Sequence, residues 1–93
     1  MNIYEELTEK IIKEQENVIG PIALEQAKKV SGLTINWDKH EVIMSGNEKD
    51  ILEQLVNNYK HLFGQASVEV CKDAVKNIIS KVPADKIPSQ LQK

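Results

Sequence analysis

The strongest constraint on the fold of this chain is an internal repeat with a spacing of 44 residues. Segment 18–28 reads Val-Ile-Gly-Pro-Ile-Ala-Leu-Glu-Gln-Ala-Lys, and segment 62–72 reads Leu-Phe-Gly-Gln-Ala-Ser-Val-Glu-Val-Cys-Lys. Three of the eleven aligned positions are identical, and apolar residues upstream of both segments also correspond. Two explanations are open: a structural repeat, or a chance similarity between two amphipathic helices. A structural repeat predicts two similar units that face each other about an approximate two-fold axis.

Apolar residues at three- and four-residue spacing predict four helices. The expected helices span about residues 3–19, 21–30, 48–63 and 66–82. Asn2 and Asn47 are suited to cap the first and third of them, because asparagine accepts a hydrogen bond from the first turn of a helix. Gly20 and Gly64 are suited to end them, since glycine readily adopts the left-handed conformation that closes many helices.

Residues 33–45 change to an alternating pattern, which predicts a β-hairpin around the turn Trp37–His40. If Asn36 pairs with Glu41, Leu33 lies opposite Met44. Residues that pair in this way point to the same face of the hairpin. The expected inner face holds Leu33, Ile35, Val42 and Met44, and the expected outer face holds Thr34, Asn36, Glu41 and Ile43. A two-residue loop and a four-residue turn both keep this register. An isolated hairpin is marginally stable, so we expect it to pack on the helices or to be completed by another strand.

The predicted fold is therefore α+β and mostly helical, with two helix–Gly–helix units flanking a central β-hairpin in the order α-α-β-β-α-α. One globular domain is expected over residues 1–82. Residues 83–93 are predicted to form a mobile C-terminal tail, because Pro83 stops the last helix and only Ile87 and Leu91 could anchor the residues after it.

Composition argues against several classes of partner. The net charge is −2, and all twelve basic residues are lysines, whereas nucleic-acid binding normally needs a basic surface and often the arginine guanidinium. No apolar run approaches the ~18 residues of a membrane-spanning helix, so we expect no membrane partner. The single cysteine, Cys71, cannot form a disulfide within the chain, which favours a cytoplasmic location.

Few residues could carry catalysis or bind a metal ion. His40, His61 and Cys71 are the imidazole and thiol groups of the chain, and their spacing matches no metal-binding motif. The serines lie in no nucleophile motif, and the four glycines form no phosphate-binding loop. We therefore expect no metal, no cofactor and no enzymatic activity, and a packing role for Cys71 on an apolar helix face.

The leading functional hypothesis is a small, regulatory protein-interaction or oligomerisation module. Its partner would be a second copy of the chain, giving a homodimer, or another protein. The hairpin supplies the predicted partner-binding residues: Trp37, Ile43, Thr34 and Glu41. Two interpretations of Trp37 are open, since it could pack in the core or project as an aromatic anchor for the partner.

The alternative hypothesis is a small-ligand sensor. Helical bundles form pockets between their helices, and such a pocket is expected here between the two helical units. Its predicted lining residues are Tyr59, Phe63, Cys71 and His61.

Segment 18–27, Val-Ile-Gly-Pro-Ile-Ala-Leu-Glu-Gln-Ala, resembles the Ile-Gly-Pro-(Ile/Met)-Ala segments of small helical association modules in bacterial signalling proteins. The resemblance covers about ten of the 93 residues, and the hairpin at 33–45 has no place in that pattern. It implies a bacterial origin and an association or regulatory role, and it assigns no functional residues.

Overall fold

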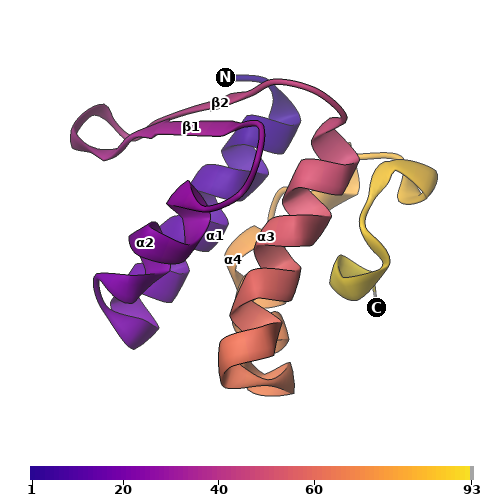
Figure 1. Ribbon diagram of the computed structural model, residues 1–93. Helices are drawn as coiled ribbons and strands as arrows, with labels where there is room; N and C mark the ends of the chain where they lie inside the picture. Colours follow the sequence, from indigo (N-terminus) through magenta and orange to yellow (C-terminus); the bar gives the residue numbers. More distant parts are fainter. Residues whose placement is uncertain (93) are drawn as a thin grey trace.

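The computed structural model describes residues 1–92 and confirms the α+β fold with the predicted order of elements. The helices and strands are α1 (Ile3–Ile19), α2 (Ile22–Lys28), β1 (Leu33–Asn36), β2 (Glu41–Met44), α3 (Glu48–Phe63) and α4 (Gln65–Val75). Figure 1 shows the hairpin at one end of the helices and the two helix-connecting turns, α1–α2 and α3–α4, at the opposite end.

The predicted capping residues lie at the ends of the two long helices, α1 and α3. The Asn2 side chain accepts a hydrogen bond from the backbone N–H of Glu5 at 2.9 Å, and the Glu5 carboxylate accepts one from the backbone N–H of Asn2 at 3.0 Å. This reciprocal pair is a capping box. Asn47 caps α3 through its side-chain oxygen, which accepts a hydrogen bond from the backbone N–H of Asp50 at 3.0 Å. Gly20 and Gly64 end α1 and α3 with φ angles of +77° and +74°, which only glycine adopts without strain.

The 44-residue repeat is visible in the pattern of burial. The buried residues of α1 are Leu7, Thr8, Ile11, Ile12 and Gln15, and those of α3 are Ile51, Leu52, Leu55, Val56 and Tyr59. Each residue of the second set follows its counterpart by 44 positions. In addition, α1 packs against α4 and α2 packs against α3, as an approximate two-fold axis requires. The two helical units therefore have the same architecture.

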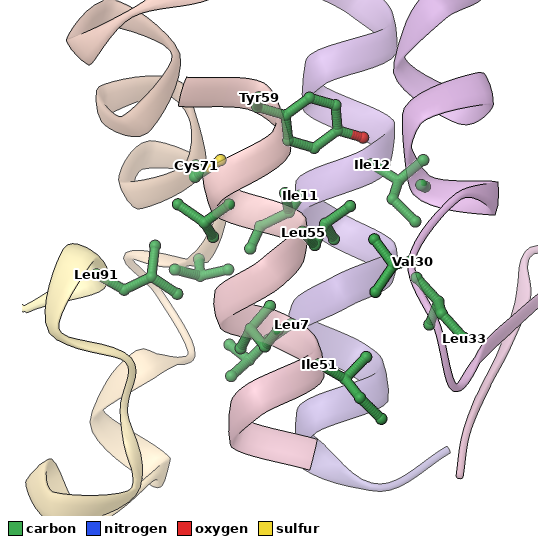
Figure 2. Packing of buried hydrophobic residues seen from close by; sticks show 14 of the residues in the cluster. Leu7, Ile11, Ile12, Val30, Leu33, Ile51, Leu55, Tyr59, Cys71 and Leu91 are labelled. Carbon is green, nitrogen blue, oxygen red and sulfur yellow. The ribbon is translucent and has the colours of Figure 1, made fainter. Parts of the chain in front are cut away.

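One apolar core joins the two units. Figure 2 shows Leu7 and Ile11 of α1 in the same cluster as Leu55 of α3, with Leu91 reaching it from the C-terminal segment. These side chains are almost completely buried. Burial of apolar surface is the main force that stabilises the fold, at ~25 cal/mol per Å². Because both units contribute side chains to this single core, neither unit buries its apolar face alone.

The hairpin has the predicted register, with Asn36 opposite Glu41 and Leu33 opposite Met44. Leu33 and Val42 are buried on its inner face, which packs on the helices. A 3₁₀ turn at Trp37–Lys39, followed by His40, forms the four-residue connection. Within residues 1–92 the sheet has two strands, and the helices that cover one of its faces stabilise it.

The last predicted helix was too long. We expected it to reach residue 82, but α4 ends at Val75, and the chain continues in a 3₁₀ turn at Ile79–Lys81. The segment Asn77-Ile78-Ile79-Ser80 consists of residues with only moderate helix propensity. Similarly, the helix predicted over 21–30 is limited to Ile22–Lys28.

The C-terminal segment packs on the bundle, which differs from the predicted mobile tail. It forms 3₁₀ turns at Ala84–Lys86 and Ser89–Leu91, and both Ile87 and Leu91 belong to the core. The Tyr4 hydroxyl donates a hydrogen bond to the backbone carbonyl of Lys86 at 2.7 Å. The two apolar anchors, Ile87 and Leu91, are thus sufficient to pack the C-terminal segment on the bundle. Lys93, the last residue of the predicted tail, lies outside the described residues.

Candidate functional site

Cys71 is a packing residue. Its side chain is fully buried, and its sulfur accepts a hydrogen bond from Nε2 of Gln15 at 3.3 Å. Burial raises the pKa of the thiol to about 11, so the thiol is protonated and unreactive at neutral pH. Within residues 1–92, no group of three or more histidine, cysteine, aspartate or glutamate side chains is arranged to hold a metal ion.

The four residues predicted to line a pocket between the units lie in different environments. Tyr59 and Cys71 are fully buried in the core, and the Tyr59 hydroxyl donates a hydrogen bond to the backbone carbonyl of Ala23 at 2.7 Å. Figure 2 shows the Tyr59 ring reaching from α3 towards the first helical unit. Burial is the main reason why the pKa of Tyr59 is raised. His61 and Phe63 are exposed at the end of α3, so the predicted set forms no single lining.

The outer face of the hairpin carries three of the predicted partner-binding residues. Thr34 and Ile43 lie opposite each other, and Glu41 follows on the same face. All three are exposed, and 54% of Ile43 is accessible. The outer edge of β2 is partly protected, because the Glu5 carboxylate accepts a hydrogen bond from the backbone N–H of Met44 at 2.9 Å.

Trp37 does not belong to this outer face. Its indole N–H donates to the Glu16 carboxylate, with distances of 3.2 and 3.3 Å to the two oxygens. Its ring lies 4.4 Å from that of His40, whose Nδ1 is 3.5 Å from a carboxylate oxygen of Glu9. Trp37 is partly buried against the core. This placement favours the packing interpretation of Trp37, because carboxylates on α1 hold the hairpin tip against the helices. The role of Trp37 in partner binding stays a prediction.

The most exposed apolar surface of the helices lies at the opposite end, beside the two glycine turns. Val18 is 58% exposed, Leu62 46% and Phe63 41%. Val18 and Leu62 are equivalent in the repeat, and Ile19 is the equivalent of Phe63. We refer to Val18, Ile19, Leu62 and Phe63 as the apical surface. The sequence pattern had assigned these residues to the apolar stripes of the helices, but the structure leaves the last turn of each stripe in contact with solvent.

A small pocket opens in the apical surface. Its volume is about 90 Å³, and it lies between the end of α1 and the beginning of α4. It is lined by Gln15, Val18, Ile19, Phe63, Ala66, Ser67 and Val70. We call this the apical pocket. Its wall is mainly apolar, which suits an apolar side chain better than a charged group.

Gln15 and Ser67 are the polar residues that line the apical pocket, and the sequence pattern predicted neither of them as a site residue. Gln15 is fully buried, and its Nε2 donates to the backbone carbonyl of Ser67 at 2.9 Å and to the Ser67 hydroxyl at 3.0 Å. Its Oε1 is buried and has no hydrogen-bond partner among the described residues. A signal was present in the sequence, because Gln15 occupies an apolar stripe position whose repeat equivalent is Tyr59. A buried acceptor without a donor is uncommon in proteins.

A second, larger pocket lies beneath the C-terminal segment. Its volume is about 450 Å³, within the ~300–1,000 Å³ range of small-molecule sites. Its apolar wall includes Ile79, Val82, Ile87 and Leu91, and Lys76 also lines it. We call this the C-terminal pocket.

Comparison of the chain with protein-family models, curated proteins and solved structures gives no match. The resemblance of segment 18–27 to bacterial association modules therefore stays a prediction. Among the helices of residues 1–92, none is both long and apolar enough to cross a membrane.

Proposed function

We propose that this chain is a non-enzymatic protein-interaction module that binds its partner through the apical surface. The observation that carries the proposal is the presence of exposed Val18 and Phe63 in the wall of a pocket at one end of the bundle, with exposed Leu62 next to Phe63 in the chain. Large apolar side chains that gather on a surface favour a binding role, since monomeric proteins rarely leave such groups together in water. Aromatic residues such as Phe63 often contribute much of the binding energy.

We favour another protein over a second copy as the partner. The apical surface consists of four side chains, and Ile19 is only partly exposed. A stable interface usually buries ~800 Å² on each partner, which is more than these side chains offer. The apical surface is better matched to a short segment of another protein. We place the module in the cytoplasm, because its only cysteine is an unpaired, buried thiol.

Selection of peptides from a random library tests this proposal. We expect the selected peptides to bind the wild-type chain and to lose most of their affinity for a variant with Val18→Ser, Leu62→Ser and Phe63→Ser. Ile43→Ser is the matched control, because Ile43 is equally exposed but lies on the hairpin. Light scattering at micromolar concentration, in low and high salt, should give the mass of a monomer. Binding that depends on Ile43, or a stable dimer, would overturn the assignment of the apical surface to a foreign segment.

Small-ligand binding is the second candidate function, favoured by the volume of the C-terminal pocket. Its apolar wall and Lys76 suit an amphipathic carboxylate, so dodecanoate is a suitable probe. We expect dodecanoate to raise the melting temperature, and Lys76→Glu to abolish the effect. Lys28→Glu, on the exposed side of α2, is the control. A melting temperature that dodecanoate leaves unchanged would exclude this class of ligand.

A further inference from the structure

The C-terminal pocket continues into a second pocket along α4. The second pocket has a volume of about 320 Å³, and Lys76, Ile79 and Leu91 line both pockets. Because they share three residues, the two pockets adjoin and form one groove, which we call the α4 groove. The α4 groove is longer than the C-terminal pocket alone, so it suits an elongated molecule better than a compact one.

The two ends of the α4 groove differ in polarity. The end beneath the C-terminal segment is mainly apolar, with Val82, Ala84 and Ile87 in its wall. The other end is lined by four charged side chains from α4 and its C-cap: Glu69, Lys72, Asp73 and Lys76. A groove with one apolar and one charged end matches an amphiphile. Its chain would lie beneath the C-terminal segment, and its polar head would lie on α4.

The charged end holds two carboxylates and two ammonium groups. Nζ of Lys72 lies 3.5 Å from a carboxylate oxygen of Glu69, so these two side chains form an ion pair. Within residues 1–92, neither Asp73 nor Lys76 takes part in a salt bridge, and both are exposed. They are three positions apart and therefore neighbours on the surface of the helix. The head of a ligand thus meets one negative and one positive charge that are not paired with each other.

We propose that the α4 groove binds a single-chain amphiphile with a zwitterionic head, such as a lysophospholipid with a choline headgroup. This inference rests on the second candidate function and names the class of its ligand. The anionic group of the head pairs with Lys76, and the cationic group pairs with Asp73. A purely anionic head would pair with Lys76 but would place a second negative charge beside Asp73, which is unfavourable.

The C-terminal segment covers the second helical unit as the hairpin covers the first. The Glu5 carboxylate accepts a hydrogen bond from the backbone N–H of Met44 in the hairpin. Lys49, the repeat equivalent of Glu5, donates to the backbone carbonyl of Asp85 in the C-terminal segment at 3.0 Å. Figure 1 shows the hairpin and the segment on opposite sides of the helices. The hairpin has a strand pair, whereas the segment has 3₁₀ turns alone, so a ligand beneath the segment should hold it more firmly on the bundle.

Three probes with chains of the same length test the head of the ligand. Dodecylphosphocholine is zwitterionic, dodecanoate is anionic and dodecyltrimethylammonium is cationic, and calorimetry measures their binding below the concentrations at which they form micelles. We expect dodecylphosphocholine to bind about two- to fivefold more tightly than either of the others, because it makes one further exposed ion pair.

Two variants test the assigned charges. Asp73→Asn should lower the affinity for dodecylphosphocholine to that for dodecanoate, and Lys76→Gln should weaken the binding of both. Asp38→Asn is the matched control, because Asp38 is also exposed but lies in the hairpin turn. Unchanged binding of dodecylphosphocholine by Asp73→Asn would overturn the proposed pairing of the cationic group.

Hydrogen exchange of the wild-type chain tests where the probe lies. The backbone N–H groups of Ile87 and Leu91 donate to Ala84 and Pro88 in the 3₁₀ turns of the C-terminal segment. Dodecylphosphocholine at about ten times its dissociation constant should slow their exchange about tenfold. The N–H of His40 is the control, since it closes the 3₁₀ turn of the hairpin and should exchange at an unchanged rate. Unchanged exchange of Ile87 and Leu91 would place the ligand elsewhere and overturn the inference.

The inference and the second candidate function can fail separately. If dodecanoate binds as tightly as dodecylphosphocholine, the groove is a ligand site but the zwitterionic head is wrong. If none of the three probes binds, both are wrong. We also expect the protein to stay in the supernatant when vesicles of dioleoylphosphatidylcholine are sedimented, because the groove takes a single chain. Cosedimentation would identify a bilayer surface as the source of the head and overturn the inference.

Discussion

At the scale of single residues, this protein places polar groups inside its core and gives most of them a partner. Tyr59 and Gln15 both donate to backbone carbonyls of the opposite unit. A buried hydrogen bond contributes little on its own, but an unpaired buried group is costly. These contacts therefore fix how the two units are aligned more than they raise the total stability.

Tyr59→Phe removes one of these contacts without changing the shape of the core. We expect it to lower the free energy of unfolding by about 1 kcal/mol, measured in urea, because the buried hydrogen bond from the Tyr59 hydroxyl to the Ala23 carbonyl is lost. Tyr4→Phe is the control, since the bond from Tyr4 to Lys86 lies in a less buried place and should contribute less. Equal losses in the two variants would contradict a special role for the buried bond.

Cys71 should make the protein less stable at alkaline pH. Burial raises the pKa of the thiol from its ordinary value of 9.0 to about 11 in the folded state. Between these values the unfolded chain has lost the proton and the folded chain has kept it. The free energy of unfolding should therefore fall as the pH rises from about 9 to 11, by up to about 1.4 kcal/mol per pH unit.

The Cys71→Ala variant isolates this effect. Tyr59 also has a raised pKa and destabilises the fold in the same direction, but it is present in both proteins. The variant should show a shallower loss of stability over this pH range, as measured by urea unfolding at each pH. Parallel pH profiles would show that the thiol keeps its ordinary pKa in the fold.

At the scale of the elements, the sequence predicted correctly those features that depend on residues close together in the chain. The ends of α1 and α3 follow from asparagine caps, apolar stripes and glycines that lie close together in the chain. The hairpin register follows from alternation over a few residues. The end of α4 could not be predicted in this way, because Val82, Ile87 and Leu91 find their partners in distant elements. The apical surface was missed because periodicity does not show which helix turn remains uncovered.

The two glycine turns should respond equally to substitution. Gly20 and Gly64 have nearly the same backbone angles, and an added Cβ would meet no atom within 4 Å at either position. Gly20→Ala and Gly64→Ala should each cost about 1–3 kcal/mol, from backbone strain alone. Gly32→Ala should cost more, because its Cβ would lie 2.6 Å from the carbonyl oxygen of Ser45. Thermal unfolding of the three variants gives this ranking, and a clear difference between the first two would show that the turns are not equivalent.

At the scale of the whole molecule, the C-terminal segment completes the core. Only 5% of Leu91 is exposed, although this residue lies two positions from the end of the sequence. Leu91→Ala should therefore lower the free energy of unfolding by about 2–3 kcal/mol, as expected for a leucine in a core. Leu62→Ala changes a half-exposed leucine and should cost about 0.5 kcal/mol or less. Urea unfolding measures both, and a small loss for Leu91→Ala would indicate that the segment detaches in solution.

The paired hydrogen bonds between the units also have a consequence for how the chain could be divided. A cut in the turn at Trp37–Lys39 would give two fragments, each with one strand, one glycine turn and one member of each hydrogen-bonded pair. Neither fragment could bury its apolar stripe alone, so each should be unstructured by itself. Mixing them would restore the hairpin, the core and both crossed bonds together. The protein is therefore suited to fragment complementation, in which the recovery of helical structure reports that two separate polypeptides have met.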